Sequence, residues 1–221
     1  MTRHFDIVTF DCYGTLIDWE NGIAGAFVAT AAEDGVTLQR DDVLRAYATI
    51  EPVVEAEEYR AYREILTESA QRVAAAIGWQ LPTERRAFLA DSLQRWQPFP
   101  DTNPALERLR AAGYRLGILS NVDDDLLAAT CRHFTVDFDL VVTAQQVRSY
   151  KPAPGHFLAA KELIDSARWL HAAQSNFHDI VPMNAMGIPT AWVNRHGAAP
   201  LPGGTPTYEV RDLCGLAELL A

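Results

Sequence analysis

Short apolar segments that run into polar residues recur along the chain and alternate with helical patterns. The two clearest are FDIVTF at 5–10, followed by Asp11, and RLGILSN at 115–121. Three further candidate strands lie at 140–143, 169–176 and 190–194. Strands that alternate with helices pair in parallel through right-handed crossovers. The sequence therefore predicts an α/β fold built on a parallel sheet.

The helical pattern between these strands is clearest in NPALERLRAAG, residues 103–113. Asn103 is the expected N-cap, Pro104 the first helical residue, and Gly113 follows the helix end. Further helices are predicted at 123–133, at 155–166 and in a short segment that ends at Gly187.

Polar residues at the ends of the strands are expected to converge. In an open parallel sheet, ligands bind beyond the carboxyl ends of the strands. Asp11, Ser120 and Asn121 follow the first two strands, and the segment 176–179 follows the fourth. One site at this edge of the sheet should contain them all.

Residues 19–97 have a different texture, because they contain helical patterns and no convincing strand. Pro52 is expected to break one of these helices. The predicted helices cover 22–34, 41–50, 59–77 and 83–96. We predict a helical cap at 19–97, inserted after the first strand and lying over the strand ends. Residues 1–18 and 98–221 then form the core.

Composition limits the classes of partner. The 221 residues are 48% hydrophobic, enough for a proper core. A net charge of −10 disfavours nucleic acid and anionic membranes, which need a basic face, but permits a small anionic substrate in a local cationic pocket.

The three cysteines show no disulfide or metal-ligand spacing. Without a signal segment or a membrane-length apolar run, we expect a cytoplasmic protein, for which a homodimer is plausible.

Four motifs carry a resemblance to a known family: DCYGT, ILSN, SYKP and SNFHD. In order and spacing, over nearly the whole chain, they resemble the motifs of the haloacid dehalogenase superfamily. Tyr13, two residues after Asp11, makes the chain similar to the L-2-haloacid dehalogenases. The longer run FDCYGTLIDWE is also similar to a relative that opens the ring of azetidine-2-carboxylate. The resemblance implies a Rossmann-like core, a helical cap and an aspartyl-ester intermediate.

The resemblance also implies a catalytic set. Asp11 is the expected nucleophile, since a carboxylate that forms an ester divides one displacement into two easier steps. Thr15 should orient it, and Lys151 should neutralise it and the charge that develops during ester hydrolysis. Asn176 should help to seat the leaving halide, and Asp179 should position or activate water. Asp11 could instead be an ordinary turn residue. Lys151 and Asp179 could instead form an ordinary loop ion pair.

Substrate contacts are expected beside the nucleophile. Ser120 and Asn121 should donate hydrogen bonds to a substrate carboxylate, or they merely form the turn. Tyr13 stands where related phosphatases have an acid that protonates an alkoxide, and a halide needs no such proton. Cys12 adjoins this substrate position, and we interpret it as packing rather than as a thiol catalyst.

Candidate cap residues are Arg45, Glu51 and Tyr62. Typical relatives have an arginine in the cap, at a position that aligns here with Ala46 or Tyr47. Arg45 matches that arginine if the alignment shifts by a residue. Otherwise Arg45 is an exposed helix arginine. Glu51 would favour a substrate with an ammonium group, or it is a capping acid before Pro52.

Two histidines and one aromatic residue complete the candidates. His171 is expected to be a core histidine, and His178 either a proton carrier or a loop residue packed beside Asp179. Phe157 replaces a tyrosine usual in the relatives.

The predicted function is hydrolytic removal of halide from a short L-2-haloacid, with no cofactor or metal required. Ring opening of an azetidine-2-carboxylate type of substrate is one alternative. A Mg-dependent phosphatase is another, in which Asp11, the carbonyl of Tyr13 and Asp179 would hold the ion. A catalytically inactive binding protein is disfavoured, because Asp11, Lys151 and Asp179 are all present.

Overall fold

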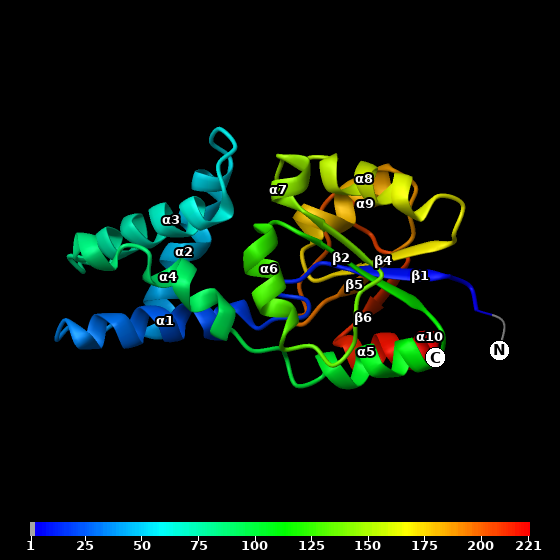
Figure 1. Ribbon diagram of the computed structural model, residues 1–221, viewed down its shortest axis with the longest axis horizontal. Coiled ribbons are helices and arrows are strands. Elements are labelled where there is room, and N and C mark those ends of the chain that lie inside the picture. The colour runs from blue at the N-terminus through cyan, green and yellow to red at the C-terminus, as the bar shows by residue number, and fades with distance from the viewer. Residues whose placement is uncertain (1–2) are drawn as a thin grey trace. The chain divides into compact units, whose positions relative to one another are not determined.

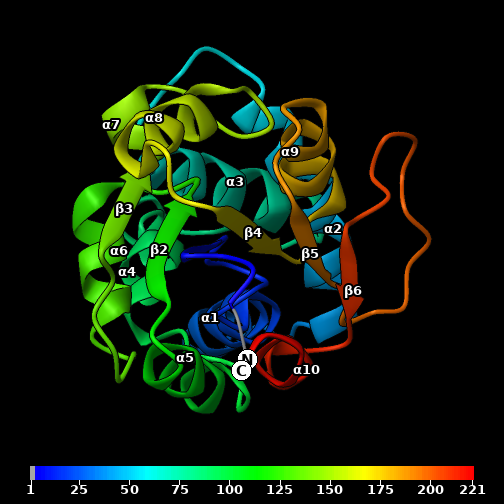
Figure 2. The same ribbon diagram turned by 90° about the vertical axis from the view of Figure 1, so that its right-hand side faces the viewer.

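The structure, a computed structural model that describes residues 3–221, contains a parallel sheet (Figure 1). Within these residues the sheet has six strands in the order β3-β2-β1-β4-β5-β6, and every neighbouring pair is parallel (Figure 2). The strands are β1 (Ile7–Phe10), β2 (Arg115–Ser120), β3 (Leu140–Thr143), β4 (Trp169–Ala173), β5 (Thr190–Val193) and β6 (Tyr208–Val210). The predicted α/β fold is confirmed, and the short β6 is an addition to the five predicted strands.

Strand β1 lies between β2 and β4, so that Ile7 is in register with both Arg115 and Trp169. All four residues of β1 are buried. A strand covered on both faces needs a continuous apolar run rather than an alternating pattern, which is why FDIVTF makes the central strand.

Helices cover both faces of this sheet (Figure 2). One face carries α7 (Ala144–Val147), α8 (Gly155–Ile164) and α9 (Val181–Ala185), and the other carries α5 (Thr102–Ala111) and α10 (Leu213–Leu220). Phe157 of α8 and Met183 of α9 are fully buried in one apolar cluster with Ile7. This packing fixes α8 and α9 against the sheet.

The described residues divide into two compact units. The core unit contains the sheet and runs to Asp18, then over Pro98–Asn121 and Cys131–Ala221. The helical unit contains Trp19–Gln97 and Val122–Thr130. Residues 122–130, which the sequence assigned to the core, group here with the helices. The position of the cap over the strand ends stays a prediction.

Amphipathic helices make up the helical unit, as the sequence predicted for 19–97. They are α1 (Trp19–Glu33), α2 (Arg40–Glu55), α3 (Tyr62–Ala76), α4 (Phe88–Ser92) and most of α6 (Asp124–Cys131), with 3₁₀ turns η1 (Thr83–Arg85) and η2 (Leu93–Arg95). Phe27, Trp79 and Phe88 meet edge to face, with Phe27 and Phe88 centroids 4.9 Å apart. Such aromatic contacts stabilise the packing of these short helices.

Residues 122–130 join this unit through Asp123, which is buried. The backbone N–H groups of Tyr62 and Arg63 donate to its carboxylate at 2.8 and 2.9 Å. The first N–H groups of a helix have no partner within the helix, and a carboxylate there is favoured by the helix dipole. Asp123 therefore caps α3 from about 60 residues away in the chain.

Three local predictions were wrong. Pro52 lies inside α2 rather than ending it, near the C-terminal end of the helix. Asn103 is within α5, and its side chain bonds His133 and Thr135 instead of capping the helix. Residues 83–96 form two 3₁₀ turns around the short α4, not one helix. In each case tertiary contacts outweigh a local preference.

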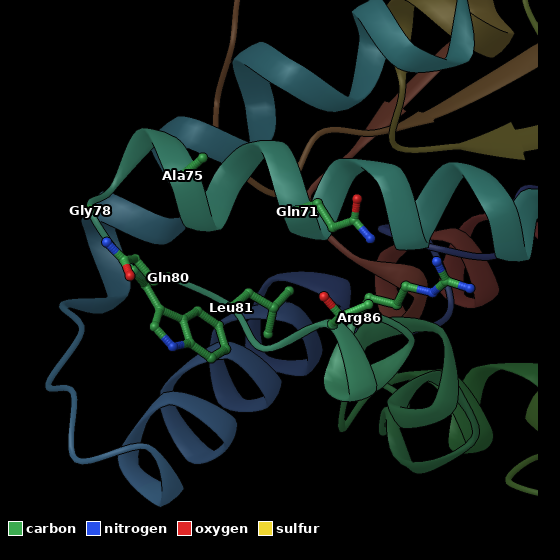
Figure 3. A pocket seen from close by; sticks show the side chains of 8 residues that line it. Gln71, Ala75, Gly78, Gln80, Leu81 and Arg86 are labelled. Carbon is green, nitrogen blue, oxygen red and sulfur yellow. The ribbon is translucent and has the colours of Figure 1, made fainter.

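The helical unit also has a surface pocket, shown in Figure 3. Its lining residues are Gln71, Ala75, Gly78, Trp79, Gln80, Leu81, Thr83 and Arg86. It includes none of the candidate catalytic residues. Across the described part of the chain, every helix is too short or too polar to span a membrane.

Candidate active site

Asp11 stands at the carboxyl end of β1, where the chain turns sharply. Its N–H donates to Ala172 of β4 at 3.1 Å, which continues the sheet pairing as far as Asp11. The N–H groups of Leu16 and Ile17 then both donate to the carbonyl of Cys12. Gly14 has φ +98, a conformation that costs glycine little and other residues more. The turn thus aims a carboxylate beyond the sheet.

Lys151 is the centre of the predicted site and is only 1% exposed. Its Nζ donates to Asp11 Oδ1 at 2.9 Å, to Asp179 Oδ1 at 2.7 Å and to the Leu119 carbonyl at 3.0 Å. The three N–H bonds of the ammonium group are therefore all used. Burial acts to lower the pKa of Lys151, but the carboxylates of Asp11 and Asp179 raise it above its ordinary value. The ammonium group stays charged in a dry site.

Asp179 lies in a π-helical turn, η3 (Asn176–Ile180), that follows β4. The hydroxyl of Ser175 caps this turn by accepting from the N–H of His178. Asp179 Oδ1 bonds both Lys151 and His171, whereas Oδ2 has no partner within residues 3–221. Burial acts to raise the pKa of Asp179, but Lys151 and His171 hold it well below its ordinary range. Asp179 is therefore an ionised acceptor.

Thr15 controls the second oxygen of the nucleophile. Its hydroxyl donates to Asp11 Oδ2 at 2.8 Å and accepts from the N–H of Gln174 at 2.9 Å. Because the Gln174 N–H can only donate, the hydroxyl proton of Thr15 points at Asp11. Both carboxylate oxygens of Asp11 are thus held in place.

Ser120 and Asn121, at the end of β2, differ in what they contact. The amide of Asn121 accepts from the Lys151 N–H at 2.7 Å and donates to the Lys151 carbonyl at 3.1 Å. It therefore anchors the backbone of the lysine. The hydroxyl of Ser120 is buried and has no partner among the described residues, so it is a donor available to a ligand. His156 contacts the backbone carbonyl of Ser120 at 3.0 Å.

Asn176 contacts a loop of its own unit. Its amide donates to Gly204 at 2.8 Å and accepts from the Leu201 N–H at 3.1 Å. A Cβ at Gly204 would stand 1.9 Å from Asn176 Oδ1, so only glycine permits this approach. The predicted role of Asn176 at the halide stays a prediction, and its amide already has these two partners.

Cys12 and Tyr13 complete the turn. The Cys12 side chain is fully buried, and burial together with Asp11 raises the pKa of its thiol. A protonated buried thiol is a packing group rather than a nucleophile, in accord with the sequence interpretation. Tyr13 is partly exposed and forms a β-bridge with Ile17.

Within the helical unit, Glu51 and Tyr62 form a cluster with Tyr47. The hydroxyl of Tyr62 donates to Glu51 at 3.5 Å, a long hydrogen bond. Burial raises the pKa of Glu51 to about 7, and that of Tyr62 well above its ordinary value. Arg45 lies on the exposed face of α2, where it pairs with Asp42. Arg45 is thus an exposed helix arginine, which is one of the two alternatives that the sequence left open.

His171 is a neighbour of the site that the sequence did not assign to it. It is fully buried and satisfied, as expected of a core histidine, but its Nε2 lies 3.0 Å from Asp179 Oδ1. The sequence signal that could have identified this contact was a lone histidine in an apolar strand, eight residues before an acid. His178 bonds Ser175 at 2.9 Å, and burial lowers its pKa.

The donor set fits a magnesium ion poorly. Among the described residues, His, Cys, Asp and Glu side chains do not gather in groups of three or more suited to a metal. Lys151 occupies the position between the two carboxylates, and Thr15 takes the remaining oxygen of Asp11. Magnesium requires near-octahedral oxygen ligands, whereas here an ammonium group bridges the acids.

Known proteins resemble the chain in sequence and in fold. Residues 5–168 match the family model described as haloacid dehalogenase-like hydrolase. The chain is 27% identical to (S)-2-haloacid dehalogenase H-109 of Pseudomonas putida over 96% of each chain. The solved structure of a defluorinating L-2-haloacid dehalogenase has a TM-score of 0.83 at 24% identity, covering 98% of this chain and 95% of the other.

A further solved structure is the L-2-haloacid dehalogenase of Xanthobacter autotrophicus with chloropropionic acid covalently bound. It has a TM-score of 0.79 at 20% identity, covering 97% of this chain and 98% of the other. These likenesses extend over almost the entire chain and share its parallel sheet. Given its parallel sheet, its motif-bearing strand ends and the matched family model, this chain belongs to the haloacid dehalogenase-like hydrolases.

Proposed function

We propose that the protein is an L-2-haloacid dehalogenase that works through an ester of Asp11. The observation that carries the proposal is the buried Lys151, which bonds the carboxylates of Asp11 and Asp179 at once. An ammonium group so placed gives both buried carboxylates a cation as partner. The proposed substrate is a small anionic carboxylic acid.

In the first step, a carboxylate oxygen of Asp11 attacks the substrate carbon next to the substrate's carboxylate. The new C–O bond forms as the carbon–halogen bond breaks, and the halide departs with the bonding electrons. Attack from the side opposite the halide inverts that carbon, which leads to the D-2-hydroxy acid. Thr15 and Lys151 hold the attacking group, so that little orientational freedom is lost at the moment of reaction.

The leaving group accounts for Tyr13. A phosphatase needs an acid there to protonate an alkoxide, but a halide leaves without a proton. A tyrosine at this position, two residues after Asp11, therefore supports halide displacement over phosphoester cleavage.

In the second step, water attacks the ester carbonyl carbon of Asp11, and the bond from that carbon to the product oxygen breaks. One proton from water ends on the product hydroxyl, and the other is released as Asp11 ionises again. The unpartnered Asp179 Oδ2 is suited to accept a hydrogen bond from this water. Lys151 and the hydroxyl of Ser120 supply positive charge and a donor, which are worth most where water is excluded.

Ring opening of a cyclic amino acid is a second candidate, favoured by Glu51. Its partly buried carboxyl contacts Tyr62, and no ion pair forms at it within the described chain. A carboxylate beside aromatic rings is suited to a substrate ammonium group. Asp11 would attack the carbon next to the ring nitrogen, and that nitrogen would leave as the amine after gaining a proton.

Single-turnover labelling tests the ester. With enzyme in excess over 2-chloropropionate in ¹⁸O water, we expect unlabelled oxygen in the first product and one ¹⁸O in the peptide that contains Asp11. Label in the first product would mean that water attacks the substrate directly, and the covalent mechanism would be wrong.

A substrate panel separates the candidate functions. Chloroacetate, 2-chloropropionate, azetidine-2-carboxylate and p-nitrophenyl phosphate are each assayed with and without EDTA. We expect halide release that EDTA does not reduce. EDTA-sensitive phosphate release without halide release would favour the phosphatase, and turnover of azetidine-2-carboxylate alone would favour ring opening.

A further inference from the structure

A buried line of hydrogen bonds connects the sheet to Asp179. The indole N–H of Trp169 donates to Thr9 Oγ1 at 2.7 Å, and Thr9 Oγ1 lies 2.8 Å from His171 Nδ1. The other ring nitrogen, Nε2, lies 3.0 Å from Asp179 Oδ1. Thr9 and His171 are direct partners in the pairing of β1 with β4, and all four side chains are buried. The line therefore rests on the two central strands of the sheet.

The chemistry of its two ends constrains this line. An indole N–H only donates, so Thr9 Oγ1 accepts from Trp169, and the hydroxyl can still either donate to His171 Nδ1 or accept from it. At the other end, the carboxylate of Asp179 only accepts. Nε2 must therefore carry a proton. His171 therefore donates from Nε2 to Asp179, while its Nδ1 is paired with Thr9 Oγ1.

This arrangement makes the two oxygens of Asp179 unequal. Oδ1 receives N–H bonds from Lys151 and His171, which lie on different segments of the core unit. Oδ2 is buried without a partner among the described residues. Two donors from separate directions define the plane of a carboxylate, whereas one donor leaves it free to rotate about its Cβ–Cγ bond. His171 thus determines where Oδ2 points.

We propose that His171 is a positioning residue for hydrolysis of the ester, holding Asp179 so that Oδ2 accepts a hydrogen bond from the attacking water. The proposal rests on the proposed function, because it concerns the second step of that reaction. The first step involves Asp11, Lys151 and the substrate, and does not require Oδ2. Loss of His171 should therefore slow the second step alone.

Three variants separate positioning from packing. His171→Leu removes the donor, and His171→Gln retains an N–H donor near the position of Nε2. Phe157→Leu is the packing control, because its ring lies edge to face with His171 at 6.0 Å and makes no bond in the line. Thermal unfolding of each variant shows whether it folds.

The two steps are measured separately with 2-chloropropionate. Rapid-quench halide release reports ester formation, steady-state turnover reports the whole cycle, and intact mass reports esterified enzyme. For His171→Leu we expect a halide burst within about threefold of the unaltered enzyme, turnover reduced about ten- to a hundredfold, and accumulated ester. His171→Gln should recover much of the turnover, and Phe157→Leu should not accumulate ester.

Equal slowing of both steps by His171→Leu, or unchanged turnover, would overturn the role of His171 while leaving the dehalogenase function intact. An unaltered enzyme that releases no halide would instead overturn the proposed function, and this role with it.

The tautomer gives a readout that does not depend on activity. In long-range ¹H–¹⁵N spectra of the unaltered protein, we expect a proton on Nε2 of His171, and Thr9→Val should shift the Nδ1 signal. An Nε2 without a proton would remove the donor to Asp179 and overturn the proposal.

Discussion

Two acid clusters, a buried one in the core unit and a partly buried one in the helical unit, respond to burial in opposite ways. In the core unit, Asp11 and Asp179 share the ammonium group of Lys151, and the pKa of Asp179 is held well below its ordinary range. In the helical unit, Glu51 contacts a tyrosine hydroxyl and has no ion pair among the described residues, and burial raises its pKa to about 7. Burial removes water from the carboxyl groups of both clusters. Only the core cluster has a cation as partner.

The difference shows that burial alone does not set the charge of an acid. Desolvation disfavours the ionised form in both clusters, and the nearby opposite charge decides the outcome. In the core cluster, Lys151 keeps the pKa of Asp179 low, so that Asp179 stays ionised at neutral pH. The helical cluster changes charge near neutral pH, which would suit recognition of a cationic group rather than attack on carbon.

Removing the cation should produce the largest effect. Lys151→Met leaves two buried carboxylates without their partner, and we expect a loss of about 3–5 kcal/mol in the free energy of unfolding. Turnover should also fall severely. Urea unfolding measures the first, with Lys161→Met as the control, because Lys161 is the exposed lysine of α8. Equal stability of the two variants would mean that the bridge contributes nothing to folding.

Glu51 should make stability depend on pH. Its pKa is 4.5 ordinarily and about 7 in the folded chain, a difference that corresponds to about 3 kcal/mol. Below pH 4.5 both states hold the proton and there is no penalty. Between pH 4.5 and 7 the unfolded chain releases its proton first, so stability falls with rising pH, and above pH 7 it levels off.

Glu51→Gln should remove this dependence and stabilise the protein at pH 8 relative to the unaltered chain. Urea midpoints at pH 5 and pH 8 measure the effect, with the exposed Glu58→Gln as the control. A pH dependence that persists in Glu51→Gln would assign it to another group.

Tyr13→Asp would place in the core an acid without its own cation, close to Asp11. Two negative charges a few ångströms apart repel by about 4 kcal/mol at an effective dielectric near 20, partly relieved by protonation of one of them. A residual penalty of about 2 kcal/mol predicts more than a tenfold loss of turnover. Tyr13→Phe should cost less, since it adds no charge. Turnover at saturating 2-chloropropionate compares them, and greater damage in Tyr13→Phe would give the phenol hydroxyl a chemical role.

Arg45→Ala should have the smallest effect. Arg45 pairs with Asp42 on the exposed face of α2, and exposed pairs one turn apart contribute about 0.3–0.5 kcal/mol. We expect turnover and KM to change less than twofold. A large rise in KM would show that this arginine reaches the substrate during the reaction, as in the family pattern.

The strands and the polar residues at their ends could be predicted because their signals are local. An apolar run followed by a polar tip marks each strand, and parallel pairing brings the tips together. Lys151 lies beyond β3 and α7, so its place was implied only by the resemblance, and it meets Asp11 and Asp179 within hydrogen-bond distance.

The contact of His171 with Asp179 could not be predicted, because it depends on the path of the chain after β4 and on a π-helical turn. The predictions for Pro52 and Asn103 were wrong for a related reason. Their local preferences are about 1–3 kcal/mol, which tertiary packing and distant hydrogen bonds can exceed. The three-residue β6 lies just after a Pro/Gly-rich stretch and gives too short a pattern to recognise.

The capping of α3 by Asp123 has a consequence for synthesis and for inheritance. The ribosome makes α1, α2 and α3 well before residue 123. The first N–H groups of α3 therefore have no Asp123 carboxylate to bond until β2 and the residues after it have been made. A recombination event that exchanged only residues 19–97 with those of a relative would separate this helix from its cap. The structural unit of the helical insertion is therefore discontinuous, and an exchange that also carries residues 122–130 keeps α3 together with its cap.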